Sequence, residues 1–386
     1  MEMTCVEKYM SKKFEEIYDV RRMIIGRTAT LTDPQPVHLE LGRGTCQSRD
    51  ECYRGCSFGA YFSSQSATLP AAKRTGNLTT VTDSIAHSLV YDAKTNRATG
   101  VRIIDAKTKE KKIYRARVIF LCASTLGTSQ ILLNSISDTF QNGFANSSGV
   151  VGHYLMDHVS GAGASGIIPG FLDKYDKGRR PNGIYIPRFK NLSGQTEKYA
   201  RGFGYQGWSN REGWKNAMDK PGFGADYKNS FKTPGPWTFS MGSAGEMLPR
   251  FRNSVSLHKT KRDKWGMPLI HIDCAYGKNE QLMRVDMMEQ AVKMLTDVGL
   301  QNVKGNLDEN SIPGTVIHEM GTARMGHDPK TSVLNAYNQC HDVNNVFITD
   351  GSAMTSSACQ NPSLTYMALT ARAADYAAGQ MKLGDL

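Results

Sequence analysis

Residues 317–326 read Ile-His-Glu-Met-Gly-Thr-Ala-Arg-Met-Gly, and a second polar loop, Ser-Ser-Ala-Cys-Gln-Asn-Pro, follows at 356–362. An imidazole in such a loop can act as a general base for an alcohol, because its ordinary pKa is about 6.5. A single histidine is more often structural than catalytic. A nearby carboxamide that holds the substrate oxygen would favour the catalytic interpretation. We therefore predict that His318 and Asn361 meet at one site.

A short apolar strand is predicted between these loops, at 346–349, and it runs directly into Asp350-Gly-Ser352. Ligands of α/β proteins bind where such strands end, and glycine allows close approach to the backbone. The carboxylate of Asp350 can accept hydrogen bonds from a polyol chain. A second apolar run, 118–122, leads through small residues into a helix near Ser129. Backbone N–H groups at such a turn can face an anionic ligand.

The rest of the chain predicts a mixed α/β protein. Apolar spacing predicts helices at 1–18 and 279–300, and a small-residue helix is expected at about 363–381. The meander expected within 78–121 consists of strands at 78–81, 84–91, 100–105 and 112–115. Scattered aromatic residues and many glycines at 150–275 predict an antiparallel sheet. The apolar stripe expected on the long helix is Leu282, Val285, Met288, Val292, Leu295 and Val298.

The chain has 386 residues, and 47 Lys and Arg against 36 Asp and Glu give a formal charge of +11. The basic residues are dispersed, and their densest clusters, 107–112 and 259–262, lie in turns with an acid in or beside them. We therefore expect a solvated surface or a docking face for an acidic protein rather than a nucleic-acid site. No run of 18 apolar residues encodes a membrane span, and 1–8 contains no apolar core of a signal peptide.

Cys46, Cys52 and Cys56 lie in a glycine-rich loop, within a stretch of eleven residues and in the spacing C-x5-C-x3-C. Thiolates are the ligands of iron–sulfur clusters, so three of them can converge on one metal centre. The alternative is three packed or partly disulfide-linked cysteines. Zinc would require a fourth ligand that the local sequence does not provide.

Gly161-Ala-Gly-Ala-Ser-Gly166 has the glycine spacing of a dinucleotide-binding loop but not its context. Ile-Ile-Pro-Gly at 167–170 cannot continue as a helix, and no acidic residue follows at 181–190. We predict a flexible strand or turn at this position. The sequence therefore predicts no pyrophosphate site at the start of this chain.

Taken together, the C-terminal motifs resemble the glucose-methanol-choline (GMC) family of flavin-dependent alcohol oxidoreductases. The resemblance rests on His-x-x-Gly-Thr-x-x-Met-Gly at 318–326, Asn-Val-Phe-Ile-Thr-Asp-Gly-Ser at 345–352 and Asn-Pro-Ser-Leu-Thr at 361–365. Segments 121–135 and 152–158 are similar to two further family segments. The resemblance implies part of a Rossmann-like FAD domain together with an antiparallel-sheet substrate domain.

The same resemblance divides the chain. The implied parts are an interior linking segment and helix (1–45), the middle of the FAD domain with the cysteine-rich loop (46–150), the substrate domain (151–310) and the C-terminal part of the FAD domain (311–386). Tyr205, Trp208 and Trp237 are aromatic candidates for lining the substrate pocket, although core packing explains them equally well.

Carried onto matching positions, the resemblance implies that His318 removes the hydroxyl proton while a hydride passes to flavin N5. Asn361 takes the position of the family's partner His or Asn. The residues implied to surround FAD are Asp350, Gly351, Ser352, Asn361, Pro362 and Thr365.

The cysteine array followed by Gly59-Ala60 is similar to a motif in the large subunits of bacterial FAD-dependent sugar and glucoside dehydrogenases. This similarity implies a sugar or glycoside substrate and a three-iron cluster held by Cys46, Cys52 and Cys56. It also implies a cytochrome c subunit and a small chaperone-like subunit. For the full-length bacterial enzyme it favours a periplasmic location or membrane association through a partner, and it leaves the compartment of this chain open. The alternatives are an oxygen-using alcohol oxidase without a cluster, or an inactive fragment or pseudoenzyme.

Family members begin with a strand, a Gly-x-Gly-x-x-Gly turn and a helix that hold the ADP half of FAD. Residues 1–18 are instead similar to a segment from the family's interior. We therefore expect an N-terminally truncated sequence or one half of a split enzyme. Such a chain is expected to bind FAD poorly when it is expressed alone.

Overall fold

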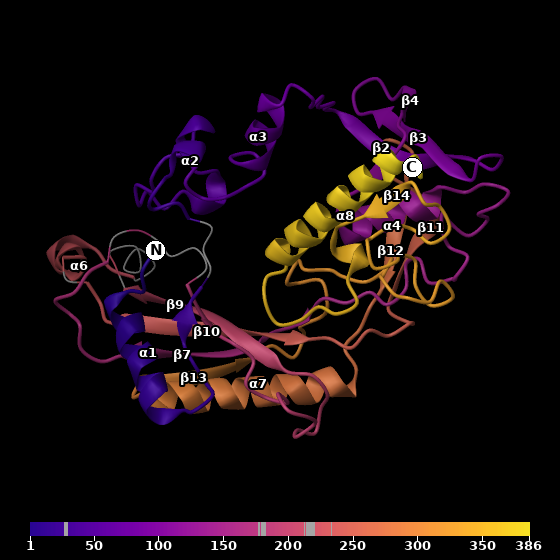
Figure 1. Cartoon of the computed structure of the whole chain (residues 1–386). Helices are drawn as coiled ribbons and strands as arrows, with labels where there is room; N and C mark the ends of the chain where they lie inside the picture. The colour runs from indigo at the N-terminus through magenta and orange to yellow at the C-terminus, as the bar shows by residue number, and fades with distance from the viewer. Residues whose placement is uncertain (27–29, 177, 179–182, 212, 214–220, 233) are drawn as a thin grey trace.

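One antiparallel sheet dominates the lower body of the molecule (Figure 1). The computed structural model describes residues 1–26, 30–176, 178, 183–211, 213, 221–232 and 234–386. In this part of the chain the sheet has seven strands in the order β1-β8-β9-β10-β7-β13, with β6 paired to β10. The strands are β1 (Ile24–Ile25), β6 (His158–Val159), β7 (Ala162–Ile168), β8 (Ile184–Ile186), β9 (Phe203–Arg211), β10 (Trp237–Glu246) and β13 (Gln301–Leu307).

The glycine-rich segment that matches a dinucleotide loop lies in β7, between β10 and β13. A Cβ at Gly163 would lie 2.2 Å from the carbonyl oxygen of Met241 on the neighbouring strand. Glycine is therefore required by close strand packing rather than by a phosphate. The prediction of a strand here, and of an antiparallel sheet over 150–275, is confirmed.

Helix α1 (Cys5–Ile17) packs on the same core as the sheet and begins at a capping box. The Thr4 hydroxyl accepts from the Glu7 N–H at 3.2 Å, and the Glu7 carboxylate accepts from the Thr4 N–H at 2.9 Å. The helix buries Val6, Met10 and Phe14 completely. Because α1 shares the core of the sheet, and β1 pairs with β8, the start of the chain is built into the lower body.

Helix α7 (Lys278–Asp297) lies along the sheet, as predicted, and five of the six residues of the expected stripe lie in or against the core. Val285 is exposed, whereas Met283 and Met287 are fully buried. A Cβ at Gly245 of β10 would lie 2.4 Å from the Met287 side chain. The missing side chain at Gly245 makes room for the two methionines, so the buried face extends beyond the predicted stripe, of which Val285 is exposed.

The upper body contains a parallel strand pair between helices (Figure 1). Strands β5 (Ile119–Leu121) and β14 (Val346–Ile348) pair in parallel, with Phe120 and Phe347 stacked at 4.9 Å. Their carboxyl ends lead to helix α4 (Ser124–Asn134) and to the short 3-10 helix η2 (Gly351–Ala353). Helix α8 (Ser363–Leu383) follows.

A three-stranded meander joins this pair: β2 (Ser84–Asp92), β3 (Arg97–Asp105) and β4 (Lys111–Arg115). The side chain of Asn345, wholly buried, donates to the carbonyls of Ala98 and Arg117 at 2.6 and 2.8 Å and accepts from the Ala98 N–H at 3.0 Å. One amide therefore fixes the meander to β5 and β14. The strand predicted at 78–81 is wrong, because no strand forms there.

The remaining elements are β11 (Ser254–Arg262), β12 (Pro268–Asp273), α2 (Pro36–Glu40), η1 (Cys52–Arg54), α3 (Thr68–Arg74) and α6 (Gly224–Ser230). β11 and β12 form a hairpin that lies against α4. Among the described residues, no helix has the length and apolarity needed to span a membrane. The domain boundaries proposed from the sequence stay predictions.

Candidate functional site

The loop that carries His318 is fixed by one buried carboxylate. Asp157, 1% exposed, accepts hydrogen bonds from the backbone N–H groups of Gly314, Val316 and His318 at 2.8, 3.1 and 3.3 Å. The residue before the histidine, Ile317, has a φ of +59° and is 78% exposed. A β-branched residue in the left-handed region is strained, so this loop is held in an unfavourable conformation next to its imidazole.

His318 contacts a second histidine, His158, edge to face, with the ring centroids 5.0 Å apart. His318 Nδ1 and His158 Nε2 are buried without a hydrogen-bond partner in the described part of the chain. Burial lowers the pKa of His318, although the charges of Asp157 and Glu319 oppose the shift. Burial and the neighbouring His318 also lower the pKa of His158. Both rings are therefore kept largely neutral near pH 7.

Asn361 lies exposed just before α8, and its carbonyl oxygen accepts a hydrogen bond from the Tyr185 hydroxyl on β8. Its loop is anchored by Ser356, which donates to Glu246 at 2.5 Å, and by His158, whose Nδ1 meets the Ala358 carbonyl at 3.1 Å. The structure thus joins the two predicted loops through His158. In the described residues no hydrogen bond links the His318 and Asn361 side chains directly.

Asp350 organises the carboxyl ends of β5 and β14. Its carboxylate accepts from the Ser352 N–H at 2.9 Å and from the Ser352 hydroxyl, and it accepts from the Thr128 hydroxyl on α4 at 2.5 Å. Ser352 is wholly buried, so its hydroxyl supports the turn. A Cβ at Gly351 would lie 2.4 Å from the Glu319 carbonyl oxygen, so glycine lets the His318 loop approach.

The surroundings of this turn fit a flavin. The parallel strands β5 and β14 end side by side, which is where α/β sheets bind ligands. The Tyr366 hydroxyl is buried there without a partner among the described residues, and burial raises its pKa. Pro362 is buried just before α8, and Thr365 is exposed in the first turn of that helix. Asp350, Asn361 and Thr365 are thus available to hold FAD.

The cysteine loop forms a separate small pocket, lined by Cys46, Cys52, Cys56 and Phe58 among others. Cys46 and Cys56 carry thiols and no disulfide. Burial would raise the pKa of Cys56, but backbone N–H groups from Tyr61 and its neighbours lower the pKa overall. No three His, Cys, Asp or Glu side chains in the described ranges converge closely enough to hold a metal ion.

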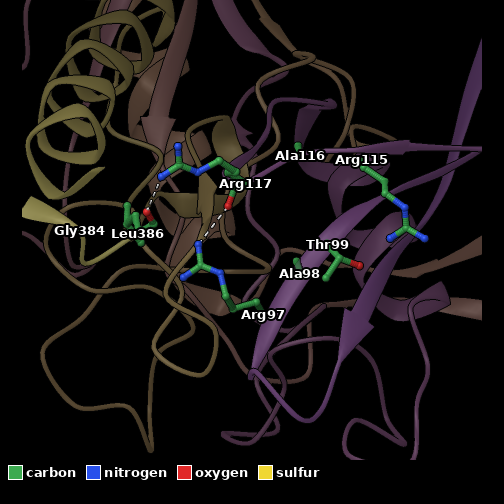
Figure 2. A pocket seen from close by; sticks show the side chains of 8 residues that line it. All are labelled: Arg97, Ala98, Thr99, Arg115, Ala116, Arg117, Gly384 and Leu386. Carbon is green, nitrogen blue, oxygen red and sulfur yellow. Dashed lines mark hydrogen bonds between the residues drawn. The ribbon is translucent and has the colours of Figure 1, made fainter. Parts of the chain in front are cut away.

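A pocket of about 680 Å³ lies between β3, β4 and the end of the chain (Figure 2). Two of its three lining arginines already bond to carbonyl oxygens: Arg97 to that of Arg117 at 3.2 Å, and Arg117 to that of Leu386 at 3.3 Å. None of the predicted catalytic or flavin-binding residues lines it. We therefore place the functional site at the His318 loop.

Sequence reasoning missed the contributions of Asp157, His158 and Tyr185 to the site. The available signal was the polar Asp157-His158 pair within an otherwise apolar and glycine-rich stretch. Among the aromatic pocket candidates, Tyr205 and Trp237 belong to the core, and Trp208 is exposed on β9.

Comparison with known proteins identifies the family of this chain. Two models described as GMC oxidoreductase match residues 38–160 and 249–370. A 2-methyl-1,2-propanediol dehydrogenase from Mycolicibacterium austroafricanum is 31% identical over 295 residues, which are 73% of this chain and 51% of that protein. The fructose dehydrogenase large subunit of Gluconobacter japonicus is 26% identical over 345 residues, 89% of this chain and 61% of that subunit. The chain therefore spans between about half and three fifths of these relatives.

A solved structure shares the fold. The formate oxidase of Aspergillus oryzae RIB40, studied for its FAD modification, superposes with a TM-score of 0.58 at 14% identity. The match covers 82% of this chain and 64% of the oxidase. The two family models together with the arrangement of β5, β14 and the His318 loop lead to one conclusion: the chain belongs to the GMC oxidoreductase family.

Proposed function

We propose that this protein is an FAD-dependent dehydrogenase that oxidises a CH–OH group of a sugar, glycoside or related small polyol. The observation that supports it most strongly is the half-buried imidazole of His318, whose Nδ1 has no hydrogen-bond partner among the described residues and whose neighbour His158 contacts the loop of Asn361. The fructose dehydrogenase subunit and the diol dehydrogenase among its relatives support the substrate class.

The described side chains divide the chemistry between them. His318 Nδ1 is the enclosed ring nitrogen, so Nε2 is the atom that takes the alcohol proton. The Asn361 carbonyl oxygen is occupied by Tyr185, which leaves its NH2 group to donate to the alcohol oxygen. FAD, when bound, accepts the hydride that leaves the carbon bearing the alcohol oxygen. The alcohol thus loses one proton and one hydride and becomes a carbonyl.

The lowered pKa of His318 predicts a pH profile. Only the neutral imidazole accepts a proton, and burial moves its protonation below the ordinary value of 6.5. We expect kcat/KM to rise with pH along a limb centred below 6.5 and to be flat above it. Steady-state kinetics from about pH 4.5 to about pH 9, a range that covers the limb and the plateau above it, measures this. A limb centred above pH 7 would contradict a desolvated base.

The reaction class is tested with D-fructose, D-gluconate and 2-methyl-1,2-propanediol as substrates. Flavin-loaded enzyme is mixed with each alcohol without oxygen and with dichlorophenolindophenol as electron acceptor, and again in air with peroxide detection. Dye reduction with little peroxide supports a dehydrogenase. Peroxide at the same rate as alcohol loss would instead establish an oxidase, and no turnover with any alcohol would count against the proposed substrate class.

We also propose that the cysteine loop holds the three-iron cluster and that a cytochrome c subunit and a small subunit accompany the chain. The three cysteines that line one pocket and the amide-stabilised Cys56 thiol support the cluster. The relative named as a large subunit supports the presence of further subunits. In the described residues the three thiols do not lie close enough together to hold a metal ion. We therefore derive no electron-transfer step through a cluster.

The cluster has its own test. We expect anaerobically purified enzyme to contain iron and acid-labile sulfide with an iron–sulfur EPR signal, and Cys52→Ser to lose them. Cys340→Ser, at a buried cysteine outside this loop, is the matched control. An iron-free enzyme that still reduces the dye would remove the cluster from the proposal.

A further inference from the structure

Two neighbouring residues, Asp157 and His158, connect both loops of the candidate site. Each is only 1% exposed. The Asp157 carboxylate accepts from three N–H groups of the His318 loop and from the His158 N–H at 2.7 Å. His158 Nδ1 meets the Ala358 carbonyl in the Asn361 loop at 3.1 Å. The pair therefore contacts both loops, Asp157 the one and His158 the other.

The pair is itself held rigidly. His158 begins β6, which pairs with the end of β10 at Glu246. The Tyr276 hydroxyl donates to the His158 carbonyl at 2.8 Å. Met156, one residue before the pair, forms an antiparallel bridge to Met320, just beyond the catalytic histidine. A rigid attachment of this kind can set the position of loops that otherwise lack regular structure.

The bonds to Asp157 alternate along the His318 loop. The amides of Gly314, Val316 and His318 donate to the carboxylate, whereas no hydrogen bond is made by those of Thr315 and Ile317 in the described structure. The two bonds at Val316 and His318 flank Ile317, the residue with a φ of +59°. A strained residue persists only where its surroundings fix it, and these bonds do so.

Building on the proposed function, we infer that Asp157 and His158 are positioning residues for catalysis: Asp157 fixes the His318 loop, and His158 fixes the Asn361 loop relative to it. Neither side chain removes the substrate proton. A buried carboxylate is costly unless it is fully hydrogen-bonded, and here four N–H groups satisfy it. An uncharged amide at 157 would present an NH2 group to N–H donors and release the loop.

The first measurement needs no variant. Amide hydrogen exchange of the full chain, read at single residues, is expected to show alternating protection in the His318 loop. Gly314, Val316 and His318 should exchange at least about tenfold more slowly than Thr315 and Ile317, because only the first three are bonded. Uniform fast exchange across 314–318 would overturn the role of Asp157, whether or not the protein oxidises any alcohol.

The second measurement uses Asp157→Asn, with Asp263→Asn as the matched control. Asp263 also accepts two backbone N–H bonds, from Trp265 and Met267, but in the β11–β12 turn. We expect Asp157→Asn to abolish the alternating protection and to lower kcat at least about tenfold, with KM changed less than about threefold. The control should change neither. Unchanged protection in Asp157→Asn, or an equal loss in the control, would overturn the inference.

The histidine is tested by a pair of variants with opposite outcomes. Asparagine at 158 places an NH2 group near the position of Nδ1 and can still donate to Ala358, whereas phenylalanine keeps the ring without a donor. We expect His158→Phe to speed exchange across 356–361 and lower kcat, and His158→Asn to restore much of both. Equal behaviour of the two variants would show that the ring acts only by packing.

Discussion

Replacing His318 with alanine is expected to lower kcat/KM for the alcohol by about 10² to 10⁴-fold, the range typical of a lost general base. The alcohol proton would then have to leave to water. Flavin content should stay unchanged, because the turn of Asp350 and the end of β5 do not depend on the imidazole. The measurement is steady-state kinetics with dichlorophenolindophenol, together with the flavin absorbance of each preparation.

His327→Ala is the matched control for this experiment. His327 follows the same motif, but it lies exposed at the surface. We expect its replacement to change kcat/KM by less than about twofold. Comparable losses in both variants, or full activity in His318→Ala, would remove His318 from the mechanism.

Replacing Asn361 with alanine is expected to lower kcat by about 10²-fold, the scale seen when one preorganised hydrogen-bond donor is removed. The variant deletes the NH2 group that we assign to the alcohol oxygen, and it also leaves the Tyr185 hydroxyl without its acceptor. KM should change less than kcat, because the donor matters most as negative charge develops on that oxygen.

Two companion variants separate these causes. Tyr185→Phe keeps the carboxamide but removes the hydroxyl that orients it, so a smaller loss, about tenfold, is expected. Asn344→Ala, at an exposed position beside β14, should be neutral. A loss in Asn361→Ala that appears only in KM would show that Asn361 binds substrate without stabilising the transition state.

Periodicity in the sequence was sufficient where one segment determines its own structure. The spacing at 1–18 predicts α1, and the Thr4–Glu7 capping box gives it a defined start. The apolar runs at 118–122 and 346–349 predict β5 and β14. The burial of Met283 and Met287 on α7 was not predictable, because it depends on Gly245, which is distant in sequence and lacks a side chain opposite Met287.

The candidate site shows the same limit. The residue types of His318 and Asn361 point to alcohol chemistry, and the structure brings their loops together. The connection itself runs through Asp157 and His158, which lie about 160 and 200 residues from the groups they hold. Backbone N–H groups have no sequence signature, so the carboxylate that binds them could not be identified before the fold was known.

The most direct test compares the pH dependence of flavin reduction in wild type and His318→Ala. Enzyme and alcohol are mixed anaerobically, and the loss of flavin absorbance is followed at each pH, so that later electron transfer does not contribute. We predict that the wild-type rate falls with decreasing pH below 6.5 and that this limb disappears in the variant, which reduces flavin slowly at every pH. The same limb in both proteins would contradict the assignment of His318 as the base.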